Sequence, residues 1–345
     1  MQHIGIDLGG KESQVCIRDG DEKILSESRV ITDKNALSYF FKAQPKSRIV
    51  METCSESFAV ARLAQQAGHD VNIIPASVVK SLGVGARGVK TDVKDARTQS
   101  VISCRLREEL PKVHVPTQAS SDLRQALTMR ESLVEMRTQA SNTVRSYLRY
   151  HLLKVSCTPK TMPEKVRKYW ETHQKTVLPS CVERQLQVIA CLNEQLKSAD
   201  AELKELSKAD KTARLLMSVP GVGPVTALCF MSTVDDVSRF PNAHQLESYF
   251  GLTPGEYSSS GRHYRTGITK AGPSGIRRNL AQACWCLYRT RPDDPITRWG
   301  LQIALRKHKN VAITAMCRKL AGVLYAMWRD NRAYNPKLLE CSHPI

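Results

Sequence analysis

The chain has 345 residues, enough for two or three domains, and its apolar fraction of 41% is ordinary for a protein with a real core. Its formal net charge of +18 indicates a polyanionic partner, either nucleic acid or an acidic membrane surface. We find no apolar stretch long enough for a membrane span and no signal-peptide pattern, so nucleic acid in the cytoplasm is the better expectation. The eleven cysteines are scattered without a CxxC pair, which is typical of reduced thiols.

Residues 1–117 have the pattern of an α/β domain. Short apolar runs between glycines predict strands, and apolar residues at helical spacing predict helices. In chain order the predicted elements are strands at His3–Asp7, Ser13–Arg18 and Lys23–Val30, a helix at Asn35–Lys42, a strand at Arg48–Met51, a helix at Phe58–Ala67, a strand at Asp70–Pro75, a helix beginning at Val78–Leu82, and a helix at Asp92–Glu108. Three strands followed by strand–helix units match the order of a ribonuclease-H-like fold.

Four acidic residues are the most informative feature of this region. Asp7 and Glu52 each end a buried apolar run, and Asp92 and Asp95 lie three apart, on one face of a helical turn. Carboxylates at the ends of buried strands are costly unless something pairs with them, and a hard cation such as Mg²⁺ (or Mn²⁺) takes oxygen ligands. Taken singly, each acid is better explained by a structural role than by a catalytic one. Together, in a basic chain, the four acids predict a metal site for phosphodiester chemistry.

Residues 118–209 contain no glycine and alternate charged with apolar residues. Ser121–Leu153 and Val182–Leu206 are predicted to be two long helices, forming an antiparallel hairpin or coiled coil. We expect this region to act in spacing or dimerisation, or as a solvated scaffold.

Residues 210–345 are predicted to be a third, mainly α-helical domain. It opens with a helix end, a Pro-Gly-Val-Gly turn that contains Gly221 and Gly223, and a new helix start, as in a helix-hairpin-helix. Such glycines let backbone N–H groups approach a phosphate, although the same turn also serves as a plain helix connector.

A run of serines, Ser258, Ser259 and Ser260, precedes Gly261 and a basic stretch. From composition alone this is a flexible surface loop. The functional interpretation is a nucleophilic serine held among cations, whose proton is removed by His263 or a metal-bound carboxylate. Three cations are candidates to neutralise the developing charge and bind nucleic acid: Arg262, Arg265 and Lys270.

The segment from Glu256 to Lys319 has thirteen Lys or Arg against three Asp or Glu, a net charge of +10. It includes Arg277 and Arg278, which we expect to bind phosphates because guanidinium groups pair with them bidentately. Trp285 and Trp299 lie between these cations, and we expect them in the core.

With these motifs placed, the chain resembles the DEDD transposases of one bacterial insertion-sequence family, relatives of the Piv-type DNA invertases. The resemblance rests on Asp … Met-Glu … Thr-Asp-x-x-Asp-Ala, Pro-Gly-Val-Gly, Gly-Leu-Thr-Pro … Ser-Ser and Ile-Thr-Lys-Ala-Gly-Pro-Ser-Gly-Ile-Arg, and it covers nearly the whole chain. It implies a RuvC-like domain whose carboxylates are Asp7, Glu52, Asp92 and Asp95, and a transposase domain with a serine. Spacing favours Ser258 over Ser259. Glu52 is preferred over its competitor Glu56 because it directly ends the strand.

The resemblance also implies partners. Family members are guided by a structured bridge RNA that pairs with donor and target double-stranded DNA, and they act as dimers or tetramers with composite sites. They would be nucleoid-associated in bacteria. The expected function is therefore RNA-guided, Mg²⁺-dependent recombination through a phosphoserine intermediate.

Three alternatives stay open at this point. A RuvC-type nuclease or resolvase would cut with metal-activated water. A non-catalytic RNA-binding scaffold would use the acids only to cap helices. A sugar-kinase-like or actin-like ATPase shares the Asp-x-Gly-Gly turn at Asp7, but the further phosphate and adenosine motifs of those proteins are not found.

Overall fold

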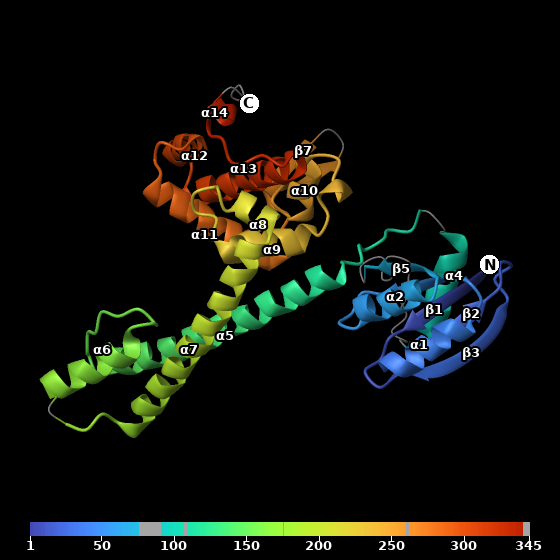
Figure 1. Cartoon of the computed structure of the whole chain (residues 1–345), viewed down its shortest axis with the longest axis horizontal. Helices are drawn as coiled ribbons and strands as arrows, with labels where there is room; N and C mark the ends of the chain where they lie inside the picture. The colour runs from blue at the N-terminus through green and yellow to red at the C-terminus, as the bar shows by residue number, and fades with distance from the viewer. Residues whose placement is uncertain (76–90, 107–108, 175, 260–261, 341–345) are drawn as a thin grey trace. The chain divides into compact units, whose positions relative to one another are not determined.

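The computed structural model describes residues 1–75, 91–106, 109–174, 176–259 and 262–340, and the helix predicted to begin at 78–82 lies outside these ranges. The chain divides into two compact units, residues 1–116 and 117–345 (Figure 1). The predicted middle region, 118–209, therefore falls within the second unit.

The first unit is a mixed α/β structure in which the five strands expected from the sequence all form. Its elements are β1 (Gln2–Asp7), β2 (Glu12–Arg18), β3 (Ile24–Ile31), α1 (Lys34–Ala43), β4 (Ser47–Glu52), α2 (Ser57–Gln66), β5 (Asp70–Ile74) and α4 (Asp92–Arg105). The strand order in the sheet is β3-β2-β1-β4-β5. Strands β1, β2 and β3 pair antiparallel, whereas β4 pairs parallel with both β1 and β5.

The alternation of side chains along each strand separates two faces of this sheet. On one face Ile4, Ile6, Ile49 and Met51 join a buried cluster with residues of α1 and α2. The other face carries Gly5 and Val50 and is covered by α4 (Figure 1).

Helix α4 packs unusually close to β1. A Cβ atom on Gly5 would lie 2.1 Å from the carbonyl oxygen of Ala96 and 2.4 Å from the backbone nitrogen of Ser100. Further along the same helix Ser103 is hydrogen-bonded to Nδ1 of His3 at 2.9 Å. Because His3 faces Ser103 and Gly5 faces Ala96, α4 runs antiparallel to β1, and its N-terminus lies at the edge where β1 ends.

The second unit is mainly helical. Its elements are α5 (Gln118–Tyr150), α6 (Met162–Tyr169), a π-helical turn (Trp170–Gln174), α7 (Ser180–Ala209), α8 (Lys211–Leu216), α9 (Pro224–Val234), a 3₁₀ turn (Val237–Arg239), α10 (Ala243–Tyr249), β6 (Pro254–Ser259), β7 (Arg262–Ile268), α11 (Ser274–Thr290), α12 (Pro295–Arg306), α13 (Lys309–Asp330) and α14 (Lys337–Glu340).

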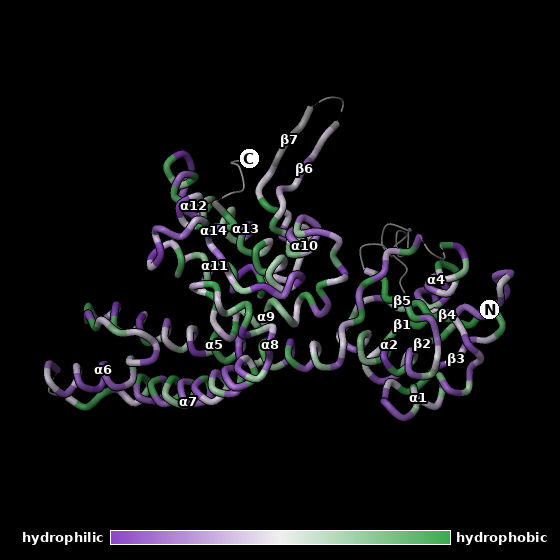
Figure 2. Tube along the Cα trace, turned by 45° about the horizontal axis from the view of Figure 1, so that its top comes forward, coloured by the Kyte–Doolittle hydropathy of each residue, from purple (hydrophilic) through white to green (hydrophobic). Residues whose placement is uncertain are grey.

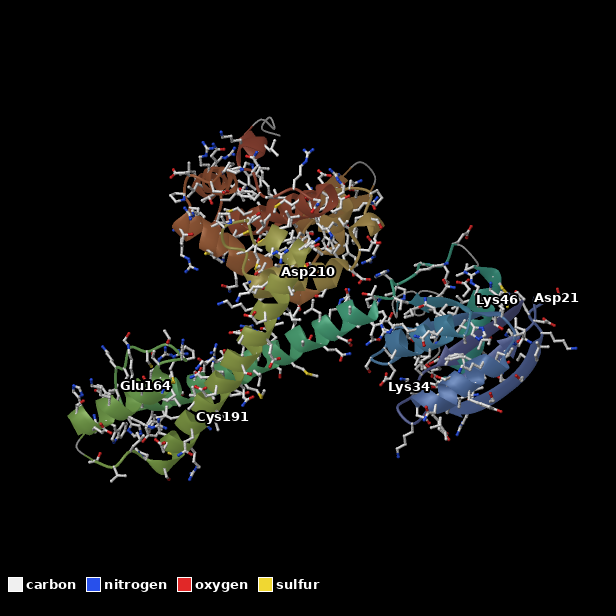
Figure 3. The ribbon with its side chains drawn as sticks, in the orientation of Figure 1. Asp21, Lys34, Lys46, Glu164, Cys191 and Asp210 are labelled. Carbon is white, nitrogen blue, oxygen red and sulfur yellow. The ribbon has the colours of Figure 1, made fainter. Side chains whose placement is uncertain are left out.

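The two long helices predicted from the sequence are α5 and α7, and they pack against each other (Figure 1). They are fastened to the rest of the unit by polar contacts. Arg124 of α5 donates from Nε to the carbonyl oxygen of Ser232 at 2.6 Å, and Thr117 donates from Oγ1 to Asp235 at 2.6 Å. At the other end, Asp210 joins α7 to α8 and caps α8 by accepting from the backbone N–H of Ala213 (Figure 3).

The core of this unit is built from α9, α10, α11 and α13, with Trp285 and Trp299 packed against it as predicted. Of the described helices, α13 alone is long and apolar enough to cross a membrane, which the sequence analysis did not anticipate. Half of its apolar window is buried in the protein, and residues such as Leu320 and Leu324 belong to the core. Its apolarity is that of a central core helix.

The close approach of β1 and α4 generates a stability prediction. Gly5→Ala should lower the free energy of unfolding by about 1–3 kcal/mol, because the new methyl group meets backbone atoms that cannot rotate away. Urea denaturation measures this change. Gly20→Ala is the control, since its Cβ would meet no described atom within 4 Å, and it should change the same free energy by less than about 0.5 kcal/mol. Equal stability of the two variants would contradict the packing argument.

Candidate active site

Asp7 and Glu52 lie side by side at one edge of the sheet. They are the last residues of β1 and β4, which pair in parallel up to Ile6 and Met51, one residue earlier in each strand. Asp7 follows Gly5 by two residues and Glu52 follows Val50 by two, so both stand on the face that α4 covers. Both carboxylates are partly exposed.

Asp92 and Asp95 occupy the first turn of α4. Thr91 begins this helix, accepting through Oγ1 from the backbone N–H of Lys94 at 3.3 Å. Asp92 is exposed, whereas Asp95 is 3% exposed and directly precedes Ala96, the residue that packs on Gly5. The direction of α4 therefore brings this turn to the edge where Asp7 and Glu52 stand. The helix turn with Asp92 and Asp95 and the strand ends with Asp7 and Glu52 therefore lie at the same edge of the sheet.

The donor chemistry of these acids suits a hard divalent cation, which prefers carboxylate oxygens. Among the described residues, however, no three His, Cys, Asp or Glu side chains come close enough together to hold a metal ion. The shared edge is thus established by the fold, while the ligand set predicted from the sequence stays a prediction.

The sequence left Glu56 as a competitor of Glu52, and the structure gives the two carboxylates different surroundings. Glu56 lies just before α2, whose residues Val60, Ala61 and Ala64 pack on the opposite face of the sheet. The hydroxyl of Ser55 donates to Glu56 at 2.9 Å, and this hydrogen bond lowers the pKa of the carboxyl. Position favours Glu52 as the partner of Asp7.

The serine segment is a β-hairpin rather than an irregular loop. Strands β6 and β7 pair antiparallel, with Ser258 opposite His263 and Ser259 opposite Arg262. Figure 2 shows the two strands standing out from the helices of their unit. Ser258 is exposed, and its Oγ donates a hydrogen bond of 2.7 Å to Oε1 of Glu256, two residues earlier on β6. Because successive strand residues alternate, position 259 belongs to the other face of the hairpin.

The Lys-Ala-Gly-Pro-Ser-Gly-Ile-Arg motif forms the base of this hairpin. Lys270 has left-handed backbone geometry, with a φ of 56°, and its N–H donates to the carbonyl of Gly251 at 3.1 Å. Arg277, predicted to bind nucleic acid, instead directs Nη1 to the carbonyl oxygens of Phe250, Gly272 and Pro273. One guanidinium group thus joins the chain entering the hairpin to the chain leaving it.

Several other predicted phosphate contacts have partners within the protein. Arg278 forms ion pairs with Glu131 and Glu135 of α5. Gly221 has a φ of 86°, and a Cβ there would lie 2.7 Å from the carbonyl oxygen of Ala283 in α11, so packing explains this glycine. A Cβ atom added to Gly223 would meet no described atom within 4 Å. For Arg262 and Arg265 the structure gives a place on β7, and their nucleic-acid contacts stay a prediction.

Sequence reasoning missed two residues of this site, Glu256 and Arg277 in its structural role. The spacing of Glu256 and Ser258, two apart on a strand, was a usable signal once the segment is recognised as a strand. The anchoring role of Arg277 had no such signal, because its three acceptors are backbone atoms.

Comparison with known proteins agrees across most of the chain. A family model described as Transposase IS116/IS110/IS902 family matches residues 213–297, and a model for DEDD transposases matches residues 4–152. The chain is 26% identical over 343 residues to the transposase for insertion sequence element IS1328 of Yersinia enterocolitica, covering 96% of this chain and 98% of that protein. It is 26% identical over 344 residues to the transposase for insertion sequence element IS1111A of Coxiella burnetii, covering 96% and 90%. A probable family 20 transposase of Pseudomonas aeruginosa is 24% identical over 345 residues, covering 97% and 99%.

The contacts of Arg277 generate the prediction for this site. Arg277→Ala leaves three carbonyls without their charged donor, and such hydrogen bonds contribute about 1.5–3 kcal/mol each. Amide hydrogen exchange at Thr269 and Lys270 should accelerate at least tenfold, on the order expected for 1.4 kcal/mol. Arg289→Ala, which removes a single donor to the carbonyl of Trp285, is the control and should leave those amides unchanged. Unchanged protection in Arg277→Ala would show that the hairpin base does not depend on this group.

Proposed function

We propose that this chain, a member of the IS116/IS110/IS902 family of transposases, cuts and rejoins DNA. In the proposed reaction the DNA becomes covalently linked to Ser258. The observation that carries the proposal is the exposed Ser258 hydroxyl on a hairpin with an anchored base, hydrogen-bonded to a carboxylate. A nucleophilic serine needs access to the phosphate and a group that takes its proton. By strand alternation, position 259 falls on the face of the hairpin opposite to that of Glu256 and Ser258.

The proposed reaction conserves bond energy. Oγ of Ser258 attacks the scissile phosphorus, a serine–phosphate ester forms, and the bond from phosphorus to one deoxyribose oxygen breaks. The hydroxyl of an exchanged strand then attacks the same phosphorus and releases Ser258. Since one ester replaces another at each step, no nucleotide hydrolysis is required.

We propose that the first unit is a ribonuclease-H-like domain and supplies the metal-binding part of the site. This part is the acidic edge, the edge of the sheet at which Asp7, Glu52, Asp92 and Asp95 lie. The four acids occur in the order D, E, D, D, all within the residues matched by the DEDD model. A bound Mg²⁺ or Mn²⁺ would supply charge stabilisation at the phosphate. Asp7, Glu52, Asp92 and Asp95 are the residues that would hold it.

A guide RNA, donor and target DNA, and assembly into dimers or tetramers complete the proposal. The net charge of +18 supports binding of more than one nucleic acid. Because the acids and the serine belong to different units, assembly would also allow one site to draw on two subunits. Sequencing the RNA that co-purifies with the protein tests the first of these partners: a discrete structured species supports guidance, and RNA of random sequence contradicts it.

The nucleophile is tested by trapping the protein–DNA adduct. Ser258→Ala should lower the yield of denaturation-resistant adduct at least about 10³-fold, while RNA and DNA binding are retained. Ser259→Ala is the matched control and should form the adduct. Mass spectrometry of the digested adduct locates the modified residue. Cleavage without any adduct would favour a nuclease that uses activated water, and no metal-dependent cleavage at all would favour a binding scaffold.

The acidic edge is tested by metal binding as well as by activity. Asp95→Asn removes a buried carboxylate and should weaken Mn²⁺ binding, followed by paramagnetic resonance, at least about tenfold. It should lower DNA cleavage in parallel. Asp21→Asn is the control, since Asp21 (Figure 3) lies in the β2–β3 turn at the opposite edge of the sheet. Equal Mn²⁺ affinity of the two variants would remove Asp95 from the ligand set.

A further inference from the structure

We propose that Glu256 is the general base that takes the proton of Ser258. The inference rests on the proposed function, because it gives a role to a neighbour of the proposed nucleophile. Oε1 of Glu256 accepts the Ser258 hydroxyl at 2.7 Å, within the distance from which a base removes a proton. Neither the matching family models nor the sequence motifs assign this residue a role.

The geometry of β6 makes the contact a local consequence of the strand. Residues two apart on a strand project to the same side, so Glu256 and Ser258 are neighbours whenever β6 is extended. The pairing of β6 with β7 keeps it extended, and Arg277 fastens the base of the hairpin. The Glu–Ser pair therefore depends on few residues outside the hairpin.

The register identifies the charged groups that face this pair. Arg265 lies opposite Glu256 on β7, and His263 lies opposite Ser258. His263 is the alternative base by position, and Oε1 of Glu256 accepts a hydrogen bond from the Ser258 hydroxyl.

The proton balance of the step is simple. As the bond from Oγ to phosphorus forms, the hydroxyl proton moves to Oε1 of Glu256, and the carboxylate becomes a neutral acid. The leaving deoxyribose oxygen takes a proton from water. When the strands are rejoined, the attacking hydroxyl gives its proton to water, and Glu256 returns its proton to the departing Ser258. Both residues end in their starting states.

Neutralising Glu256 also removes an electrostatic repulsion near the phosphate. A carboxylate beside the DNA backbone repels it in the ground state, and this repulsion disappears once the proton has been transferred. The interaction therefore improves on the way to the transition state, which is the condition for a gain in rate.

Glu256→Gln tests the proposal because the amide oxygen still accepts the Ser258 hydroxyl but is not basic. The rate of adduct formation should fall about 10²–10⁴-fold. DNA affinity should stay equal or increase, because a negative charge is removed. The fall of the wild-type rate at low pH, which reports protonation of the base, should disappear. Glu256→Asp should recover part of the rate.

Two variants serve as comparisons. Glu202→Gln changes another exposed Ser–Glu pair of the same unit, Ser198 and Glu202 on α7, and should behave like the wild type. His263→Ala should keep the pH profile of the wild type if Glu256 is the base.

The outcomes separate this inference from the proposed function. Adduct formation by Glu256→Gln at the wild-type rate, or with the wild-type pH profile, overturns the role of Glu256 while Ser258 stays the nucleophile. A pH profile that changes only in His263→Ala assigns the base to His263. An adduct formed by Ser258→Ala overturns the proposed function itself, and the role of Glu256 with it.

Discussion

The backbone contact between β1 and α4 is the constraint on which the acidic edge depends. A glycine at position 5 lets the carbonyl of Ala96 approach the strand where any side chain would prevent it. Once α4 lies across the sheet at this distance and runs antiparallel to β1, its first turn must lie where β1 and β4 end. Four acids that are separated by up to 88 positions in the chain are thereby brought to one edge. Thr91 caps the helix at the same place, so its start is fixed together with its position.

The serine hairpin of the second unit also depends on a few contacts, which hold its base. Two short strands alone are marginal in water. Here the chain on either side of the hairpin is held by the backbone bond from Lys270 to Gly251 and by the guanidinium group of Arg277. The arginine donates to carbonyls at the point where α10 ends and α11 begins. These contacts fix the base of the hairpin on the helical core.

The positive charge of the chain is less available than its composition indicates. Arg278 is paired with Glu131 and Glu135, and Arg318 with Glu247 at 2.6 Å. Lys319 lies over the ring of Trp299, with 4.9 Å from Nζ to the ring centroid, and burial lowers its pKa. These cations hold helices of the second unit together.

The sequence by itself predicted the five strands of the first unit, the two long helices, the packing of Trp285 and Trp299 against the core, and the resemblance to a transposase family. These features are local or periodic: alternation, helical spacing and short motifs are all written in neighbouring residues. The sequence also indicated the candidate acids Asp7 and Glu52, because an acid that follows an apolar run can be recognised from the sequence alone. Only the tertiary structure decided that α4 brings Asp95 to the edge shared by Asp7 and Glu52, since that follows from packing at Gly5. Likewise the partners of Arg277 and Arg278 are backbone carbonyls and distant carboxylates, which no spacing along the chain reveals. Glu256 lies between these cases: its contact with Ser258 is local, but it exists only because the segment folds as a strand and not as the loop that its composition suggested.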